Sequence, residues 1–307
     1  MQQWYSFCGN KKEVFEFLKK ISIFLLFFSL AFFSLAQALE LPSLDKPKVR
    51  MSIAPGETAY GELVIENRSG ESRTMRCYLE DWRYSAGGDG TKDFFPPSTN
   101  VLSCASWISF SPADFTIQPY GRKKISYSIK VPEGAQGGYY AVLFFESNFG
   151  GQGAGAGEEN VGGEIGLAIR IGTLFYVEIK GNASRRASLE NLSFTQTKGS
   201  GLAILLSLNN TGNVDITSAT TYHIMDKNGL IHARGEFNEA YTLPGDNVRL
   251  AAAWDEPIPS GKYTLVVTSD IGKGLEDTNS GRGPVIVKEA LIQIGDYGEV
   301  ASVGELR

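Results

Sequence analysis

Histidine and cysteine are scarce in this sequence, with two His and three Cys among 307 residues. No cluster of cysteines or carboxylates accompanies His223 or His232, so the chain offers no set of metal ligands. It also contains no GxSxG, HExxH or CxxC motif, the signatures of common hydrolases, zinc proteases and thiol redox centres. We therefore expect a protein that is not an enzyme and that carries neither a metal nor another cofactor. A catalytic carboxylate pair assembled by the fold remains open.

Net positive charge is also lacking. The whole chain carries a formal charge of −5. Residues 1–38 hold four Lys and two Glu, a net of +2, so the remainder carries −7. An acidic chain without a basic stripe is a poor candidate for binding nucleic acid or an anionic membrane surface. We expect no small-molecule substrate either.

Long apolar runs are absent except at the start of the chain. Ile21 to Leu35 is apolar apart from Ser22, Ser29 and Ser34, follows several Lys, and precedes Ala36-Gln37-Ala38. This order of charge, apolar run and small residues predicts a signal peptide, residues 1–38, cleaved after about Ala38. A periplasmic or secreted location follows. An uncleaved membrane anchor is the alternative, but the run is shorter than the roughly 20 residues that span a bilayer.

Cysteine usage agrees with export. Cys8 belongs to the predicted signal peptide, which leaves Cys77 and Cys104 as an even pair. In an oxidising compartment such a pair predicts a disulfide. A metal site or a redox thiol is the alternative, and it lacks a CxxC motif and a nearby His.

Helical periodicity is almost absent after the signal peptide, and short alternating strands separated by Gly, Pro and Asn turns take its place. Two units of about seven strands follow one another, and their strands and turns come in the same order. We therefore predict an all-β fold of two tandem immunoglobulin-like β-sandwich domains. The predicted bounds are residues 39–181 and 187–294, with a hinge near 181–187 and a frayed tail over 295–307.

A Gly-rich stretch and the strand after it stand out in the first unit. Residues 148–163 are dominated by glycine and do not fit GxGxxG, so we expect a mobile loop and no phosphate site. The strand from Glu164 to Lys180 follows. It carries apolar residues of one parity: Ile165, Leu167, Ile169 and Ile171. Such alternation is typical of a core strand and also of a strand that lends its side chains to a partner.

Three pieces of the first unit resemble the periplasmic chaperones of fimbrial (pilus) assembly. They are Arg50 before a Pro-Gly turn, the Gly-rich stretch, and the strand that ends in Leu174-Phe175-Tyr176. In that family the strand is lent to a pilus subunit by β-augmentation, and a basic pair grips the subunit's terminal carboxylate. The resemblance implies that the alternating residues 165, 167, 169 and 171 are partner-binding and that Arg50 is one carboxylate anchor.

The sequence departs from the family in several features, the Cys77–Cys104 pair among them. Thr173 stands where the family has the second anchor, a Lys, and Arg170 lies on the opposite parity from the isoleucines. The insertion Ser85–Asn100 is also unexpected. The segment from Trp107 to Ala141 is similar to surface-protein-interacting domains of Gram-positive envelopes.

The resulting hypothesis is a periplasmic chaperone-like or assembly-accessory protein that binds an envelope or pilus-type protein subunit. The runner-up is a structural or adhesive cell-surface module. A glycan-binding or hydrolytic sandwich is a third possibility.

Overall fold

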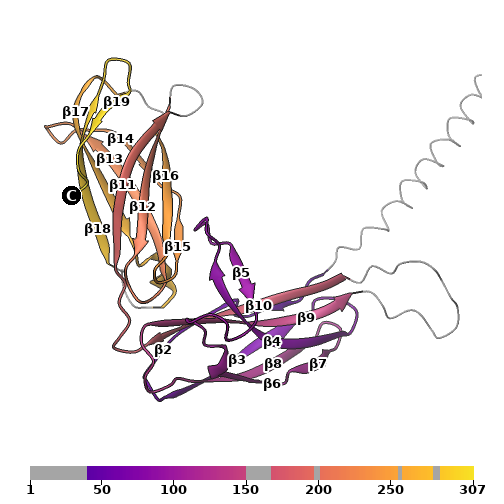
Figure 1. The fold of residues 1–307 in the computed structure, drawn as a ribbon. Coiled ribbons are helices and arrows are strands. Elements are labelled where there is room, and N and C mark those ends of the chain that lie inside the picture. The colour runs from indigo at the N-terminus through magenta and orange to yellow at the C-terminus, as the bar shows by residue number, and fades with distance from the viewer. Residues whose placement is uncertain (1–39, 150–166, 197–200, 255–257, 279–283) are drawn as a thin grey trace, which may run out of the picture. The chain divides into compact units, whose positions relative to one another are not determined.

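The computed structural model describes residues 40–149, 167–196, 201–254, 258–278 and 284–307 (Figure 1). The predicted signal peptide, most of the Gly-rich stretch 148–163 and Ile165 lie outside these residues. The described part consists of strands β1 to β19 and two short 3₁₀ helices, η1 (Ala105–Trp107) and η2 (Lys273–Thr278). The all-β prediction is therefore confirmed. In the described ranges, no helix is long and apolar enough to cross a bilayer.

The first sandwich spans β1 to β10 and consists of two sheets. One sheet has the order β1 (Ser43–Leu44), β3 (Thr58–Glu66), β8 (Arg122–Lys130) and β6 (Ile108–Ser111). The other has the order β2 (Lys48–Ile53), β10 (Leu167–Ile179), β9 (Gly138–Phe149), β4 (Arg73–Tyr84) and β5 (Lys92–Phe95), with β7 (Asp114–Ile117) also paired to β4. These are the A-B-E-D and A′-G-F-C-C′ orders of an immunoglobulin-like sandwich.

Alternation along the strands builds the core between these sheets. Leu63 and Ile65 of β3 point inward with Ile125 of β8, and Phe145 and Phe175 meet them from the opposite sheet. All five are fully buried. Since side chains of a strand alternate between its faces, a two-residue apolar period suffices to place both sheets around one core.

The second sandwich spans β11 to β19 and repeats this plan. One sheet has the order β11 (Ala187–Gln196), β12 (Leu202–Asn210) and β16 (Asn247–Trp254). The other has the order β14 (Ile231–Glu236), β13 (Ile216–Met225), β17 (Gly261–Asp270), β18 (Val285–Ile294) and β19 (Val300–Val303), with β15 (Ala240–Thr242) also paired to β13. The strands of the two sandwiches fall on either side of residues 180–186. Both sandwiches belong to one compact unit, Pro42–Arg307.

The end of the chain corrects one prediction. Residues 295–307 were expected to fray, but β19 pairs with β18, and the Arg307 and Glu289 backbones exchange two hydrogen bonds of 2.9 Å. Val300 also packs against the second core. The short segment therefore completes a sheet edge, which its polar composition did not indicate.

The predicted disulfide is wrong in this structure, because Cys77 and Cys104 are free thiols, both buried in the first core. Cys77 lies opposite Phe145 of β9, whereas the Cys104 amide donates to the Tyr140 carbonyl at 3.1 Å. Five residues of strand separate these two points, about 17 Å. A disulfide requires Cα atoms within about 7 Å. Burial raises the pKa of Cys77 to about 12.

Candidate functional site

Strand β10 has different neighbours along its two halves. On one side it pairs with β9 in an unbroken antiparallel register from Leu167 to Glu178 (Figure 1). On the other side it pairs in parallel with β2, and only over Leu174–Ile179. We call Leu174–Ile179 the covered half and Leu167–Thr173 the open half. Within the described part of the chain, the open half has no strand on its second side.

The boundary between the halves is set where the chain crosses between the two sheets. The Asp45 amide still bonds to the Val64 carbonyl of β3 at 3.0 Å, but from Lys48 onward the chain runs beside β10. The Leu174 amide donates to the Pro47 carbonyl at 3.0 Å. Thr173, fully buried, donates its hydroxyl to the Lys46 carbonyl at 2.7 Å. The residue at the family's Lys position therefore fastens this crossing segment.

Backbone groups of the open half face the open side at alternate residues. The Leu174 amide points toward β2, whereas the Ile179 amide points toward the other side, to the Gly137 carbonyl at 2.8 Å. In an unbroken antiparallel ladder this direction alternates residue by residue. The N–H and C=O groups of Ala168, Arg170 and Gly172 therefore point to the open side.

Two of the predicted partner-binding residues, Ile169 and Ile171, lie on the core-side face of the open half. Ile169 and Ile171 are half-buried, and Ile171 packs against the first core. Leu167 begins the strand, and only its backbone position is described. In the covered half the same parity continues with Phe175 and Val177, both buried. The structure thus brings three of the four predicted residues onto the open half, and Ile165 lies outside the described residues.

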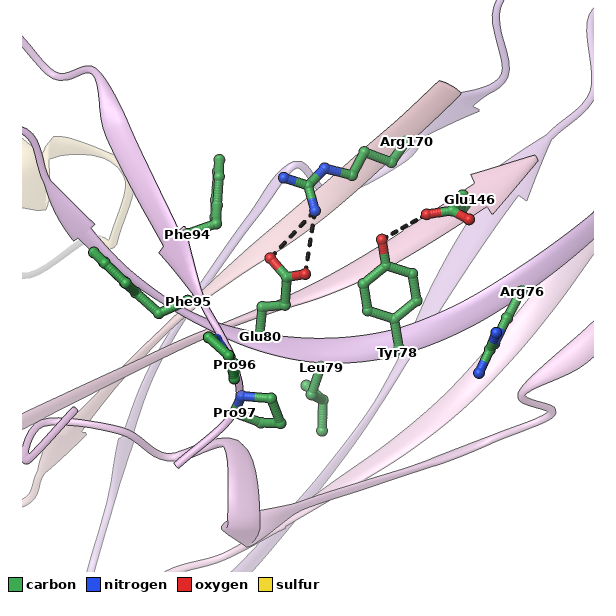
Figure 2. A pocket seen from close by; sticks show the side chains of 10 residues that line it. All are labelled: Arg76, Tyr78, Leu79, Glu80, Phe94, Phe95, Pro96, Pro97, Glu146 and Arg170. Carbon is green, nitrogen blue, oxygen red and sulfur yellow. Dashed lines mark hydrogen bonds and ion pairs between the residues drawn. The ribbon is translucent and has the colours of Figure 1, made fainter. Parts of the chain in front are cut away.

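The opposite face of the open half carries Arg170. Its guanidinium lies 4.3 Å from the Phe144 ring centroid and 5.4 Å from that of Phe94. Its Nη1 donates to both carboxylate oxygens of Glu80 at 3.2 Å (Figure 2). A hydrogen bond with Tyr78, and then the charge of Glu80, raise the pKa of Arg170. Arg170 therefore leans across the sheet, away from the open side.

A hollow of about 650 Å³ adjoins Arg170 on this face. Aromatic rings and two prolines from β5 and the following turn form one wall, and Tyr78 donates to Glu146 at 2.7 Å on the other (Figure 2). Burial and the Glu146 hydrogen bond raise the pKa of Tyr78. Nowhere in the described ranges do three or more His, Cys, Asp or Glu gather as metal ligands.

Buried Asp81 fixes the turn beside this hollow. Its carboxylate accepts the backbone amides of Ser98, Thr99 and Asn100 at 3.1, 2.8 and 2.8 Å. The Ser103 hydroxyl donates to it as well. Such a buried carboxylate holds a turn rigidly because it satisfies several amides at once. Thus the unexpected insertion 85–100 is an ordered part of the sandwich.

Arg50 is placed away from the open half, on β2 at the covered half. Its guanidinium binds two carboxylates of the chain, Glu178 of β10 and Asp215 just before β13. Sequence reasoning missed Glu178, Asp215 and Arg185, which binds Glu178. Their positions follow no motif, and only the packing of both sandwiches brings them together.

The chain is similar to known proteins at the level of solved structures. No family model matches the chain. The search of curated proteins returned no match either. Among solved structures, the class 5 fimbriae chaperone CfaA is 13% identical, with 80% of this chain and 98% of that chain covered at a TM-score of 0.45. The CupB2 chaperone of Pseudomonas aeruginosa is 12% identical over 86% of this chain and 100% of that chain, at 0.37. The E. coli chaperone DraB is 12% identical over 80% and 96%, at 0.39.

Fimbrial chaperones, the family that the sequence resembles, are thus among the structures to which this chain is similar. The immunoglobulin-like sandwiches are established by the strand orders and cores of the chain itself.

Proposed function

We propose that the chain binds an envelope or pilus-type protein subunit by adding one of the subunit's strands to the open half of β10. The observation that carries this proposal is the unpaired side of Leu167–Thr173 in the described structure. Strand addition needs outward backbone groups for affinity and alternating side chains for register. The outward backbone groups are those of Ala168, Arg170 and Gly172. The alternating side chains are those of Ile169 and Ile171.

Several other strand edges of the described part are interrupted, short or charged, although β3 and β18 are also paired on their second side over only part of their length. β11 is interrupted by a register shift between Glu190 and Ser193, and β14 meets β13 with a shift at Ile224 and Met225. The edge strands β5, β6 and β19 have four residues each, and β1 has two. β2 carries Lys48 and Arg50, and Asn238 bonds to Ala251 along β16. Bulges, short length and charge are how proteins block unwanted pairing at edges.

The open half has neither a bulge nor a short ladder, and its one charged side chain, Arg170, turns away from the edge toward Glu80. Its register against β9 is unbroken, and its two isoleucines present half-exposed apolar surface. Such an edge exposes a protein to aggregation unless something pairs with it. Retaining it is therefore consistent with a role in binding another strand.

The predicted signal peptide supports a periplasmic or secreted site for this binding. A protein subunit is the proposed partner, and neither nucleic acid nor, after signal cleavage, a membrane takes part. The proposed role is recognition without catalysis. It corresponds to a chaperone-like or assembly-accessory function.

A crosslinking experiment in the native host identifies the partner. A photo-crosslinking amino acid at position 168 should capture one protein, and the same group at exposed Ser126 of β8 serves as the matched control. Capture of the same protein with equal yield at both positions contradicts binding at the open half.

A proline substitution then tests strand pairing with the purified partner. Ala168→Pro removes an outward amide without removing a bond to β9, so folding should be nearly unchanged. Affinity should fall about tenfold or more, equivalent to one strong backbone hydrogen bond. Ala168→Ser keeps the amide and should bind normally. Equal affinity of both variants, with both folded, overturns the proposal and favours the structural or adhesive module.

A further inference from the structure

The larger sheet of the second sandwich has an apolar face that points away from the core. Odd-numbered residues of β18 lie on it, and Val285, Val287 and Leu291 are 51%, 55% and 69% exposed. A sheet face in contact with water normally carries polar side chains at such positions. β8 of the first sandwich follows this rule, since its exposed positions hold only Arg, Lys and Ser. The apolar face on β18 is therefore a candidate contact surface.

The strand register arranges this surface in rows that cross β14, β13, β17 and β18. We call the outward residues of these four strands the outer face. One row consists of Ile231, Met225, Thr264 and Leu291. The next row consists of Arg234, His223, Val266 and Glu289. Each row thus begins with a residue of β14 and ends with a residue of β18.

The two margins of the outer face match each other. In the first row both margins are apolar, because Ile231 is 47% exposed and Leu291 is 69% exposed. In the second row the margins carry opposite charges, Arg234 and Glu289, both exposed. Within the described part of the chain, neither of these two residues has an ion-pair partner. Three strand spacings of about 4.8 Å, or about 14 Å, separate them, so they do not meet within one chain.

We propose that the outer face is a contact surface between two copies of this chain. A two-fold axis that runs along the strands, between β13 and β17, places β14 of one copy opposite β18 of the other. Ile231 of each copy then faces Leu291 of the other, and Arg234 faces Glu289, because a two-fold axis makes every contact twice. Sheets that pack face to face in this way keep their strands nearly aligned, about 10 Å apart.

The size of the outer face predicts a weak dimer. Four strands are about 19 Å wide and the segment from Val285 to Leu291 is about 20 Å long, so each copy contributes about 400 Å². A standard interface uses about 800 Å² on each partner. We therefore expect a dissociation constant of about 10–100 µM. The inference does not depend on the proposed function, because the outer face and the open half belong to different sandwiches.

Charge reversal at the two margins tests this arrangement. Sedimentation velocity of the purified protein from about 5 to 500 µM should show the wild type passing from monomer to dimer. Arg234→Glu brings two carboxylates together at each margin, so the dissociation constant should rise about tenfold or more. Glu289→Arg brings two guanidinium groups together and should have the same effect. Both residues are exposed, so both variants should keep the wild-type circular dichroism spectrum.

An equimolar mixture of these two variants is the decisive sample. Each margin of a mixed dimer again pairs an acid with a base, so the mixture should dimerise about as well as the wild type although neither variant does so alone. Arg249→Glu, at an exposed position of β16 in the other sheet, is the matched control and should dimerise normally. A monomeric wild type at about 500 µM, a dimer insensitive to Arg234→Glu, or a mixture that stays monomeric overturns the proposal.

Two further variants locate the contact. Leu291→Ser keeps both charges but removes exposed apolar surface, so it should raise the dissociation constant several-fold. Ala168→Pro, which blocks strand pairing at the open half, should leave this dimer unchanged. Loss of the dimer in Ala168→Pro, with no effect of Leu291→Ser, assigns self-association to the open half and overturns the proposal.

Discussion

The open and covered halves of β10 belong to one strand with one alternating pattern, yet they have different surroundings. Both halves pair with β9 without interruption. The covered half gains β2 on its second side, and its inward residues Phe175, Val177 and Ile179 are fully buried. In the open half, Ile169 and Ile171 are only half-buried. Neighbouring chain, more than local sequence, therefore decides whether an apolar strand face is core or surface.

Hydrogen exchange is the strongest test of this comparison. The amides of Gly172 and Leu174 point to the same side of β10, but only Leu174 has a described acceptor, the Pro47 carbonyl. Leu174 should exchange at least about a thousandfold more slowly than Gly172, since a ladder amide exchanges only through local or global unfolding. Residue-resolved exchange at neutral pH measures both rates. Equal protection of the two amides breaks the distinction between the halves.

Core truncation should show the next largest difference. Phe175→Ala removes a fully buried ring that packs edge-to-face on Tyr127, and should cost about 3–5 kcal/mol of unfolding free energy. Ile169→Ala should cost about 1 kcal/mol, because this side chain already contacts water. Urea unfolding of both variants gives the two values. If Ile169→Ala lowers the free energy of unfolding as much as Phe175→Ala does, the open half belongs to the core.

The boundary itself is tested at Thr173. Thr173→Val keeps the shape but removes the hydroxyl that donates to the Lys46 carbonyl. The expected cost is about 1–2 kcal/mol, since a partly buried carbonyl loses its partner. Exchange at Leu174 should quicken in the same variant as the crossing segment loosens. Thr173→Ser, which retains the hydroxyl, is the control, and an unchanged Leu174 rate in the Val variant contradicts the fastening role.

The smallest effect concerns the phenol of Tyr176 in the covered half. Burial raises its pKa to about 12 from an ordinary 10.0, and its hydroxyl lies 3.1 Å from that of Tyr84. The folded state holds this proton longer than the unfolded chain, so stability is fully present below pH 10 and falls between about pH 10 and 12. Tyr176→Phe should cost under about 1 kcal/mol at pH 7 and lessen the alkaline loss. An identical alkaline unfolding curve refutes this contribution.

Much of the fold was predictable because strands carry their own signal. The two-residue apolar period and the Gly, Pro and Asn turns are local, so the all-β class followed from them. The structure of the end of the chain was not predictable, because pairing of Val300 with β18 depends on a neighbouring strand and not on the tail's own composition.

The candidate site was predictable only in part. The apolar parity of residues 167, 169 and 171 was visible, but the position where β2 stops depends on the crossing of Lys46 and Pro47. Counting cysteines suggested a bond between Cys77 and Cys104, whereas spacing along β9 keeps them apart. Arg50 was predicted to bind a partner's carboxylate. The carboxylate that it binds in the structure, Asp215, lies 165 residues away, so nothing in the sequence indicated the pair. Each of these outcomes depends on contacts between distant segments, which periodicity does not report.

The crossing of Lys46 and Pro47 has a geometric consequence for any added strand. This segment occupies the second side of β10 at Thr173 and Leu174, and β2 continues from it. A strand laid beside Ala168 and Gly172 runs into this chain after about six residues. The crossing would then act as an end stop that keeps a guest strand from sliding further toward the covered half, whatever its sequence.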